Sequence, residues 1–139
     1  MKIIVDVNVL LSALIRDSTT RKIILQSDFD FYFPEPSMHK IRKYEAYILQ
    51  KSGLSEKEYN ILVARLFRYI TLVPVEKVKS SWSDAVQVMG RIDEEDVVFI
   101  AVAMLVDDSI IWSDDKDFDR QKRIKVLKTA DMVKFVNSN

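Results

Sequence analysis

The stretch MKIIVDVNVLLSAL, residues 1–14, decides the fold. Its first apolar run, residues 3–5, is β-branched and ends at Asp6, and a second apolar run starts at Val9. Continuous β-branched residues are typical of a strand covered on both faces, and Asn8 is suited to cap a helix that follows. The stretch therefore predicts a buried strand of a parallel sheet, a sharp turn and a helix.

Asp6 has two interpretations. Open α/β sheets build their sites at the carboxyl ends of strands, so this carboxylate is a candidate for chemistry. An aspartate at this place can equally do no more than stabilise the turn. The stretch alone leaves both interpretations open.

The composition bounds the class of protein. At 139 residues the chain fits a single domain, residues 1–139, with a proper core. Acidic and basic residues balance at 21 each, which excludes a strongly charged binding module, and the absence of cysteine favours an intracellular compartment. The longest apolar run, residues 97–106, is too short to span a bilayer. We expect a soluble cytoplasmic protein with no membrane segment.

Strand and helix patterns alternate along the chain. Further strands are predicted at residues 29–33, 71–75, 109–112 and 124–127, with Pro74 placing the third at an edge or a strand end. Helical patterns fill the intervals, including a nearly all-apolar helix over residues 97–106. The predicted fold class is α/β, three layers of α/β/α around a central parallel sheet.

A helical hairpin is predicted in the middle of the chain. Its first arm starts after Ser37 and runs to about Ser52, and Gly53 is placed to end it. Ser55 and Glu58 have the spacing of a capping box at the start of the second arm.

Four acids are predicted to meet at one crevice. Asp6, Asp115 and Asp117 each follow a predicted strand, and Asp96 begins the apolar helix. Gathered carboxylates oppose folding unless a cation neutralises them, and Mg²⁺ or Mn²⁺ prefer such oxygen ligands. The alternative for Asp96, and for the other acids of residues 93–96, is that they only cap the helix.

One or two such ions can activate a water molecule and stabilise charge on a phosphodiester, so the acids predict hydrolytic cleavage of nucleic acid. The chain offers no competing catalytic set, since it has no cysteine and no glycine-rich phosphate loop. Its single histidine, His39, is not part of a recognisable triad and is expected at the surface.

Two basic clusters could hold a phosphate backbone near the crevice. The first cluster is Lys40, Arg42 and Lys43, and the second is Arg120, Lys122, Arg123, Lys125 and Lys128. For each cluster taken alone, an ordinary solvated surface is an equally good explanation.

Three stretches together resemble the PIN domain, the nuclease fold of VapC-type toxins. They are IIVDVNVLLSAL (residues 3–14), DVVFIAVAM (residues 96–104) and IIWSDDKDF (residues 110–118), and they occur in the family's order. The segment LQKSGLSEKEY, residues 49–59, resembles an expanded-hairpin, often uncharacterised prokaryotic branch of the family.

The resemblance implies a Mg²⁺- or Mn²⁺-dependent ribonuclease that acts on RNA, commonly as a homodimer and often as a toxin silenced by an antitoxin protein. It places catalysis and metal binding on Asp6, Asp96 and Asp115. Asp117 joins the metal ligands, and Asn8 and Ser113 support the site.

One position departs from the family. Relatives usually supply another acid from the helix after the second strand, and here His39 or Lys40 stands in its place. Glu45 lies about one helical turn downstream and could compensate. A lysine would repel a metal or take over a phosphate contact, which would slow or abolish catalysis.

Three functions remain open from the sequence. The leading one is a metal-dependent endoribonuclease, as a toxin of a toxin–antitoxin pair or outside one. The alternative, favoured by the missing acid, is a catalytically weak or inactive PIN-like module that binds RNA or protein. A phosphotransfer receiver or phosphatase-like protein would also place acids at strand ends, but the chain lacks a convincing lysine or signature for either.

Overall fold

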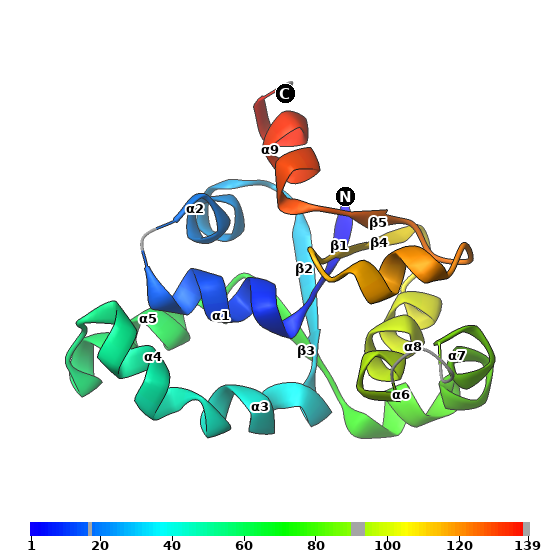
Figure 1. Ribbon diagram of the computed structural model, residues 1–139, viewed down its shortest axis with the longest axis horizontal. Helices are drawn as coiled ribbons and strands as arrows, with labels where there is room; N and C mark the ends of the chain where they lie inside the picture. Colours follow the sequence, from blue (N-terminus) through cyan, green and yellow to red (C-terminus); the bar gives the residue numbers. More distant parts are fainter. Residues whose placement is uncertain (17, 90–93, 138–139) are drawn as a thin grey trace.

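A sheet of five parallel strands forms the centre of the computed structural model, which describes residues 1–16, 18–89 and 94–137 (Figure 1). The strands are β1 (Lys2–Val5), β2 (Asp30–Pro34), β3 (Ile70–Val73), β4 (Ser109–Trp112) and β5 (Val126–Leu127). Their spatial order is β3-β2-β1-β4-β5, and each neighbouring pair is parallel. The predicted parallel sheet is confirmed, and β3 with its following Pro74 lies at an edge as expected.

The central strand β1 is the one predicted from the opening stretch. Ile3, Ile4 and Val5 are completely buried, as β-branched residues covered on both faces should be. Val5 pairs with Trp112 of β4, although the two strands are far apart in the sequence. The chain leaves β1 toward β2 and β3 and returns on the other side at β4, so the β1–β4 boundary is the switch point where open α/β sheets form their sites.

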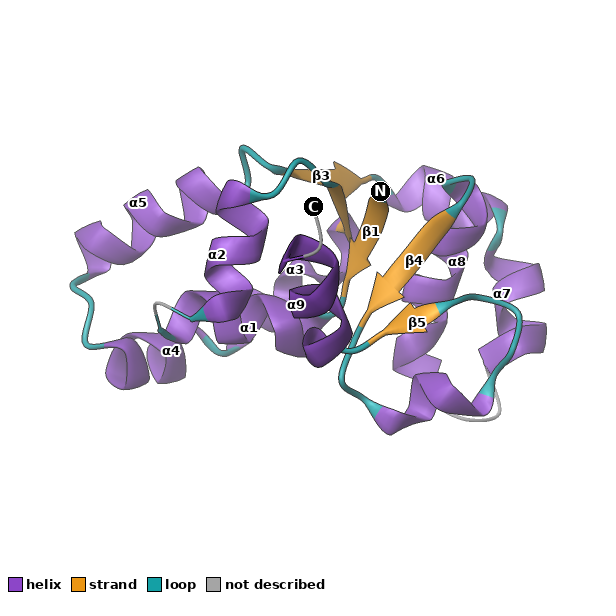
Figure 2. Cartoon of the chain, turned by 90° about the horizontal axis from the view of Figure 1, so that it is seen from above, coloured by secondary structure: helices purple, strands orange, loops and turns teal. Residues whose placement is uncertain are grey.

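Helices cover both faces of the sheet (Figure 2). The α-helices are α1 (Val7–Ile15), α2 (Thr19–Gln26), α3 (Met38–Lys43), α4 (Glu45–Ser52), α5 (Glu56–Leu66), α6 (Val75–Ser80), α7 (Trp82–Met89), α8 (Val97–Leu105) and α9 (Thr129–Asn137). Short 3₁₀ helices are η1 (Glu35–Ser37), η2 (Glu94–Asp96) and η3 (Lys116–Arg120). Helix α8 packs on β1, β2 and β4 with α6 and α7 against it, and α1, α2, α4 and α5 lie on the opposite side. The three-layer α/β/α fold is therefore confirmed.

Helix α8 occupies the interior as its composition predicts. Residues 97–103 are all buried, which a helix can be only if it is apolar on every side. No helix in the described ranges combines the length and the apolar character that crossing a membrane requires.

The predicted helical pair around Gly53 is present but interrupted. Gly53 ends α4 in the left-handed region at φ 71°, and Ser55 with Glu58 forms the complete capping box of α5. The prediction of one continuous first arm is wrong, because the helix breaks at Tyr44 (φ −95°, ψ 8°). The break turns α4 so that it packs against α1.

Two other local expectations are corrected. Asn8 does not cap the first helix, because Asp6 occupies the cap position and its side chain accepts the Val7 N–H. The third strand ends at Val73, and Pro74 then precedes α6, a six-residue helix that the sequence pattern did not predict. Proline suits this position because the first N–H groups of a helix have no partner within it.

Candidate functional site

Asp6 joins the ends of two strands. Its Oδ1 accepts the N–H of Val7 at 2.7 Å, and its Oδ2 accepts the hydroxyl of Ser113 at 2.7 Å. The side chain thus caps α1, as one interpretation held, and also contacts the residue that follows β4. Only 4% of Asp6 is exposed, and that part lines a pocket at the carboxyl edge of the sheet.

The surroundings of Asp6 disfavour its charged form. Burial raises the pKa of the Asp6 carboxyl, and the nearby Asp115 carboxylate raises it further. The hydrogen bonds from Ser113 and Val7 lower this pKa, and Lys40 lowers it slightly, but burial prevails. An ionised Asp6 therefore benefits from any additional positive charge in the pocket.

A relay of hydrogen bonds shapes the loop after β4. The fully buried Ser113 hydroxyl accepts the N–H of Asp115 at 3.0 Å, and Asp115 Oδ1 accepts the N–H of Asp117 at 2.9 Å. Because Ser113 also donates to Asp6, one hydroxyl fixes the relative positions of Asp6 and Asp115.

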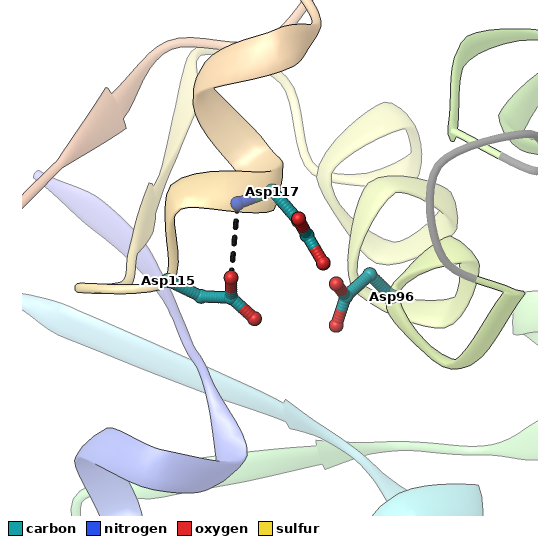
Figure 3. A group of neighbouring side chains, drawn as sticks. All are labelled: Asp96, Asp115 and Asp117. Atoms are coloured by element: carbon teal, nitrogen blue, oxygen red, sulfur yellow. Dashed lines mark hydrogen bonds between the residues drawn. The ribbon is translucent and has the colours of Figure 1, made fainter.

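Three carboxylates converge beside this loop (Figure 3). Asp96, Asp115 and Asp117 each place an oxygen atom within 4.8 Å of the others. Asp96 holds the cap position of α8, but its side chain makes no capping hydrogen bond and is directed toward the two loop acids. Of the four acids predicted to meet, Asp96, Asp115 and Asp117 form this group, whereas Asp6 lies outside it and lines a pocket with Asp96 and Asp115. Asp93 lies outside the described residues.

Two phenylalanines pack together next to these acids and connect the elements that carry them. Phe99 lies one turn after Asp96 on α8, and Phe118 directly follows Asp117 in η3. Their buried rings meet edge to face with centroids 6.3 Å apart, so α8 and η3 are locked at the point where their acids converge. This pair was not predicted from the sequence, although an aromatic residue immediately after the acidic run was a usable signal.

The pocket above the acids has a volume of about 240 Å³. Asp6, Asp96 and Asp115 line it, together with the exposed Asn8 on the first turn of α1. Lys40 and Lys43 of α3 also line it, so cations and carboxylates share the same space. Arg42 is exposed on the same helix.

Lys40 is paired within the site. Its Nζ lies 2.8 Å from Oε2 of Glu95, the residue just before Asp96, and only 20% of its side chain is exposed. Glu95 therefore offsets part of the positive charge of Lys40 beside the acidic cluster. His39 is exposed beside it, with its Nδ1 2.6 Å from the carbonyl oxygen of Pro36.

The remaining sequence candidates lie elsewhere. Glu45 begins α4, where its charge adds to the effect of burial in raising the pKa of Tyr59, and it is not among the described residues that line the pocket. The second basic cluster begins in η3, continues through the segment before β5 and ends at Lys128, directly after β5. Lys128 forms an ion pair of 3.0 Å with Asp119.

The donor set fits a hard divalent cation. Three carboxylate oxygens converge, the adjoining Asp6 has a raised pKa, and like charges at this spacing are unfavourable without compensation. Oxygen ligands of this kind are those preferred by Mg²⁺ and Mn²⁺. The cluster can therefore bind such an ion.

Comparison with known protein families shows to which family this chain belongs. A family model described as PIN domain matches residues 4–132, which include all of the sheet except the first half of β1, as well as the acids and the helical pair. No curated protein sequence matches the chain.

Proposed function

Because this chain belongs to the PIN-domain family, a nuclease-type family, we propose that it is a metal-dependent endoribonuclease that hydrolyses RNA phosphodiester bonds. The observation that carries the proposal is the convergence of Asp96, Asp115 and Asp117 within 4.8 Å at the sheet's switch point. Asp6, beside them in the same pocket, completes the acidic set.

The proposed metal ligands are Asp6, Asp96, Asp115 and Asp117, and the proposed ion is Mg²⁺ or Mn²⁺. When bound, the ion supplies Lewis-acid chemistry that activates water and offsets charge developing on the phosphodiester. The chain's own contribution is preorganisation: Ser113 orients the Asp6 and Asp115 carboxylates, and Phe99 with Phe118 holds α8 against η3.

The basic wall of the pocket is proposed to bind the RNA backbone. Lys40 and Lys43 line the same pocket as the acids, and Arg42 is exposed on the same short helix. In this proposal Lys40 contacts a phosphate, and it stands where the family resemblance predicts an acid. Asn8, exposed at the rim on α1, is placed to donate a hydrogen bond to the same backbone.

An inactive RNA- or protein-binding module is the second candidate function, and a specific observation favours it. Lys40 places a positive charge inside the pocket that must bind the metal, and Glu95 only partly offsets it. Such a cation weakens metal binding and can slow turnover.

Three further roles belong to the proposal through the family resemblance alone. They are action as a toxin with an antitoxin partner, assembly as a homodimer, and location in the cytoplasm. Size-exclusion chromatography with light scattering tests the homodimer, and a monomer at all concentrations would reject it.

The decisive assay for the proposed function is RNA cleavage with Mg²⁺ or Mn²⁺. The wild-type protein should cleave, and both EDTA and Asp96→Asn should abolish cleavage. Asp119→Asn is the matched control, because it removes the same charge from an exposed acid that lies outside the cluster. Cleavage that survives in Asp96→Asn would reject the proposal, and RNA binding by a wild-type protein that does not cleave would favour the inactive module.

A further inference from the structure

A second hollow adjoins the acidic pocket. It has a volume of about 460 Å³, within the range of about 300–1,000 Å³ typical of small-molecule sites. His39, Lys40 and Glu95 line both hollows, so the Lys40–Glu95 ion pair lies at the boundary between them. The two hollows therefore form one continuous surface rather than two separate sites.

The walls of the second hollow differ from those of the first. They are largely apolar and come from η1, α6, α7 and α8, through Pro36, Val75, Val78, Trp82 and Val98. Trp82 is the largest of these side chains and is 37% exposed. Tryptophan offers a broad flat surface for stacking together with one polar N–H group.

Trp82 lies at the junction between α6 and α7, which a hydrogen bond attaches to α8. It begins α7 immediately after Ser81, whose hydroxyl donates a hydrogen bond of 2.7 Å to the carbonyl of Ala101 in the buried helix α8. Val78, one turn before this junction, is buried beneath the hollow. The exposed indole is thus presented by packed helices.

We propose that the apolar hollow is a nucleobase subsite, in which the base next to the scissile phosphate of a single-stranded RNA stacks on Trp82. The inference rests on the proposed function, because the adjoining acidic pocket is taken as the place where the phosphate binds. Lys40, at the boundary, contacts the phosphate that links the two positions.

The charged residues that line the hollow favour binding of a nucleotide over binding of an apolar side chain from a protein partner. Lys40 and Lys79 both line the hollow, and Glu95, the one acid among the described residues of its wall, is paired with Lys40. Sites for single-stranded nucleic acid combine a cationic path for the backbone with aromatic side chains on which bases stack. The hollow has both features next to a pocket suited to phosphodiester chemistry.

Tryptophan fluorescence provides a direct test. The chain has two tryptophans, and since Trp112 is completely buried, quenching by a ligand reports on Trp82. The probes are a mixed-sequence six-nucleotide single-stranded RNA and the same backbone without bases, both titrated in EDTA so that no cleavage occurs. Val86→Ala is the matched control, because Val86 is an exposed apolar residue of the same helix that does not line the hollow.

The intact RNA should quench the fluorescence and bind about tenfold or more tightly than the abasic probe, the size expected for loss of base stacking. Because variants of Trp82 lack the reporting tryptophan, their affinities are measured by the anisotropy of fluorescein-labelled probes. Trp82→Ala should weaken binding of the intact RNA by a similar factor and leave the abasic probe unaffected. Trp82→Phe should retain most of the affinity, and Val86→Ala should behave as wild type.

Equal affinities for the two probes, or no quenching by bound intact RNA, would overturn the subsite and leave the hollow to a protein side chain. This result is distinguishable from failure of the proposed function. Base-dependent quenching in a protein that never cleaves RNA would support the subsite proposal and reject the nuclease proposal. Cleavage of RNA without base-dependent binding would support the nuclease proposal and reject the subsite.

Discussion

The hydroxyl of Ser113 donates a hydrogen bond of 2.7 Å to Oδ2 of Asp6, and so ties together the ends of β1 and β4. The same oxygen accepts the N–H of Asp115 at 3.0 Å. One buried side chain therefore orients two of the proposed metal ligands, although it ligates nothing itself in this account.

Replacing Ser113 with alanine should damage both stability and metal binding. The substitution leaves buried polar groups of Asp6 and Asp115 without a partner, which costs about 1–3 kcal/mol in the free energy of unfolding. It also removes an interaction that lowers the pKa of Asp6, so protons compete better with a metal ion. Chemical denaturation and Mn²⁺ titration measure the two effects.

Ser109→Ala is the matched control for this prediction. Ser109 begins β4, the strand that Ser113 directly follows, and it donates a hydrogen bond of 3.0 Å to the carbonyl of Ala103, away from the acids. This control should lose some stability and keep its Mn²⁺ affinity. If both variants lost metal affinity equally, Ser113 would have no specific role in orienting the ligands.

Lys40→Gln should change metal binding and RNA binding in opposite directions. Removing the cation from the acidic pocket should strengthen Mn²⁺ binding. It should also weaken RNA binding and reduce the slope of log K against log salt by about 0.7, the value for one phosphate contact on a single strand. Calorimetry and salt-dependent fluorescence anisotropy measure these quantities.

Two further variants sharpen the Lys40 prediction. Glu95→Gln releases Lys40 from its ion pair and removes a competing negative charge, so RNA should bind more tightly. Lys57→Gln removes an exposed lysine from α5, which does not line the pocket, and should leave both affinities near wild type. An unchanged salt slope in Lys40→Gln would show that Lys40 makes no phosphate contact.

The capping box of α5 predicts a pH-dependent contribution to stability. Hydrogen bonds from the Ser55 backbone and hydroxyl group hold the pKa of Glu58 below its ordinary value. The stabilisation is therefore complete above the unfolded-state pKa of glutamate, about 4.3, and is lost as the pH falls through the lower folded-state pKa. Glu58→Gln should be less stable than wild type at pH 7, and the difference should shrink at more acidic pH.

Glu56→Gln provides the comparison for the capping box. It removes the same charge from the first turn of the same helix but leaves the Ser55–Glu58 pair intact. Its destabilisation at pH 7 should be smaller than that of Glu58→Gln. Equal effects would mean that helix-dipole interaction, and not the box, accounts for the contribution of Glu58.

Much of the fold could be predicted from local pattern. The β-branched run before Asp6, the proline after β3, the glycine at the end of α4 and the apolar helix α8 each carry a physical signal that the structure bears out. The break at Tyr44 carries no such signal, because it depends on how α4 packs against α1. Helix α6 is only six residues long, too short for a helical period to stand out.

The site shows the same division between local and tertiary information. The meeting of Asp96 with the loop acids was predictable, since a helix that leads into a parallel strand begins at the edge where the carboxyl ends of the strands lie. The cap on α1 was assigned to Asn8 because its residue type suited the role, whereas the helix begins at Val7, two residues earlier than an Asn8 cap implies, and Asp6 is the cap. The Lys40–Glu95 pair joins residues 55 positions apart and required the three-dimensional structure.

The measurement that most directly tests the central claim is Mn²⁺ titration calorimetry on the wild type, Asp115→Asn and Asp119→Asn. Asp115 belongs to the converging carboxylates, whereas Asp119 is an exposed acid of the same loop that lies outside them. The account predicts saturable Mn²⁺ binding by the wild type and by Asp119→Asn, and its loss in Asp115→Asn. Equal Mn²⁺ binding by all three proteins, or none by the wild type, would contradict the proposed metal centre.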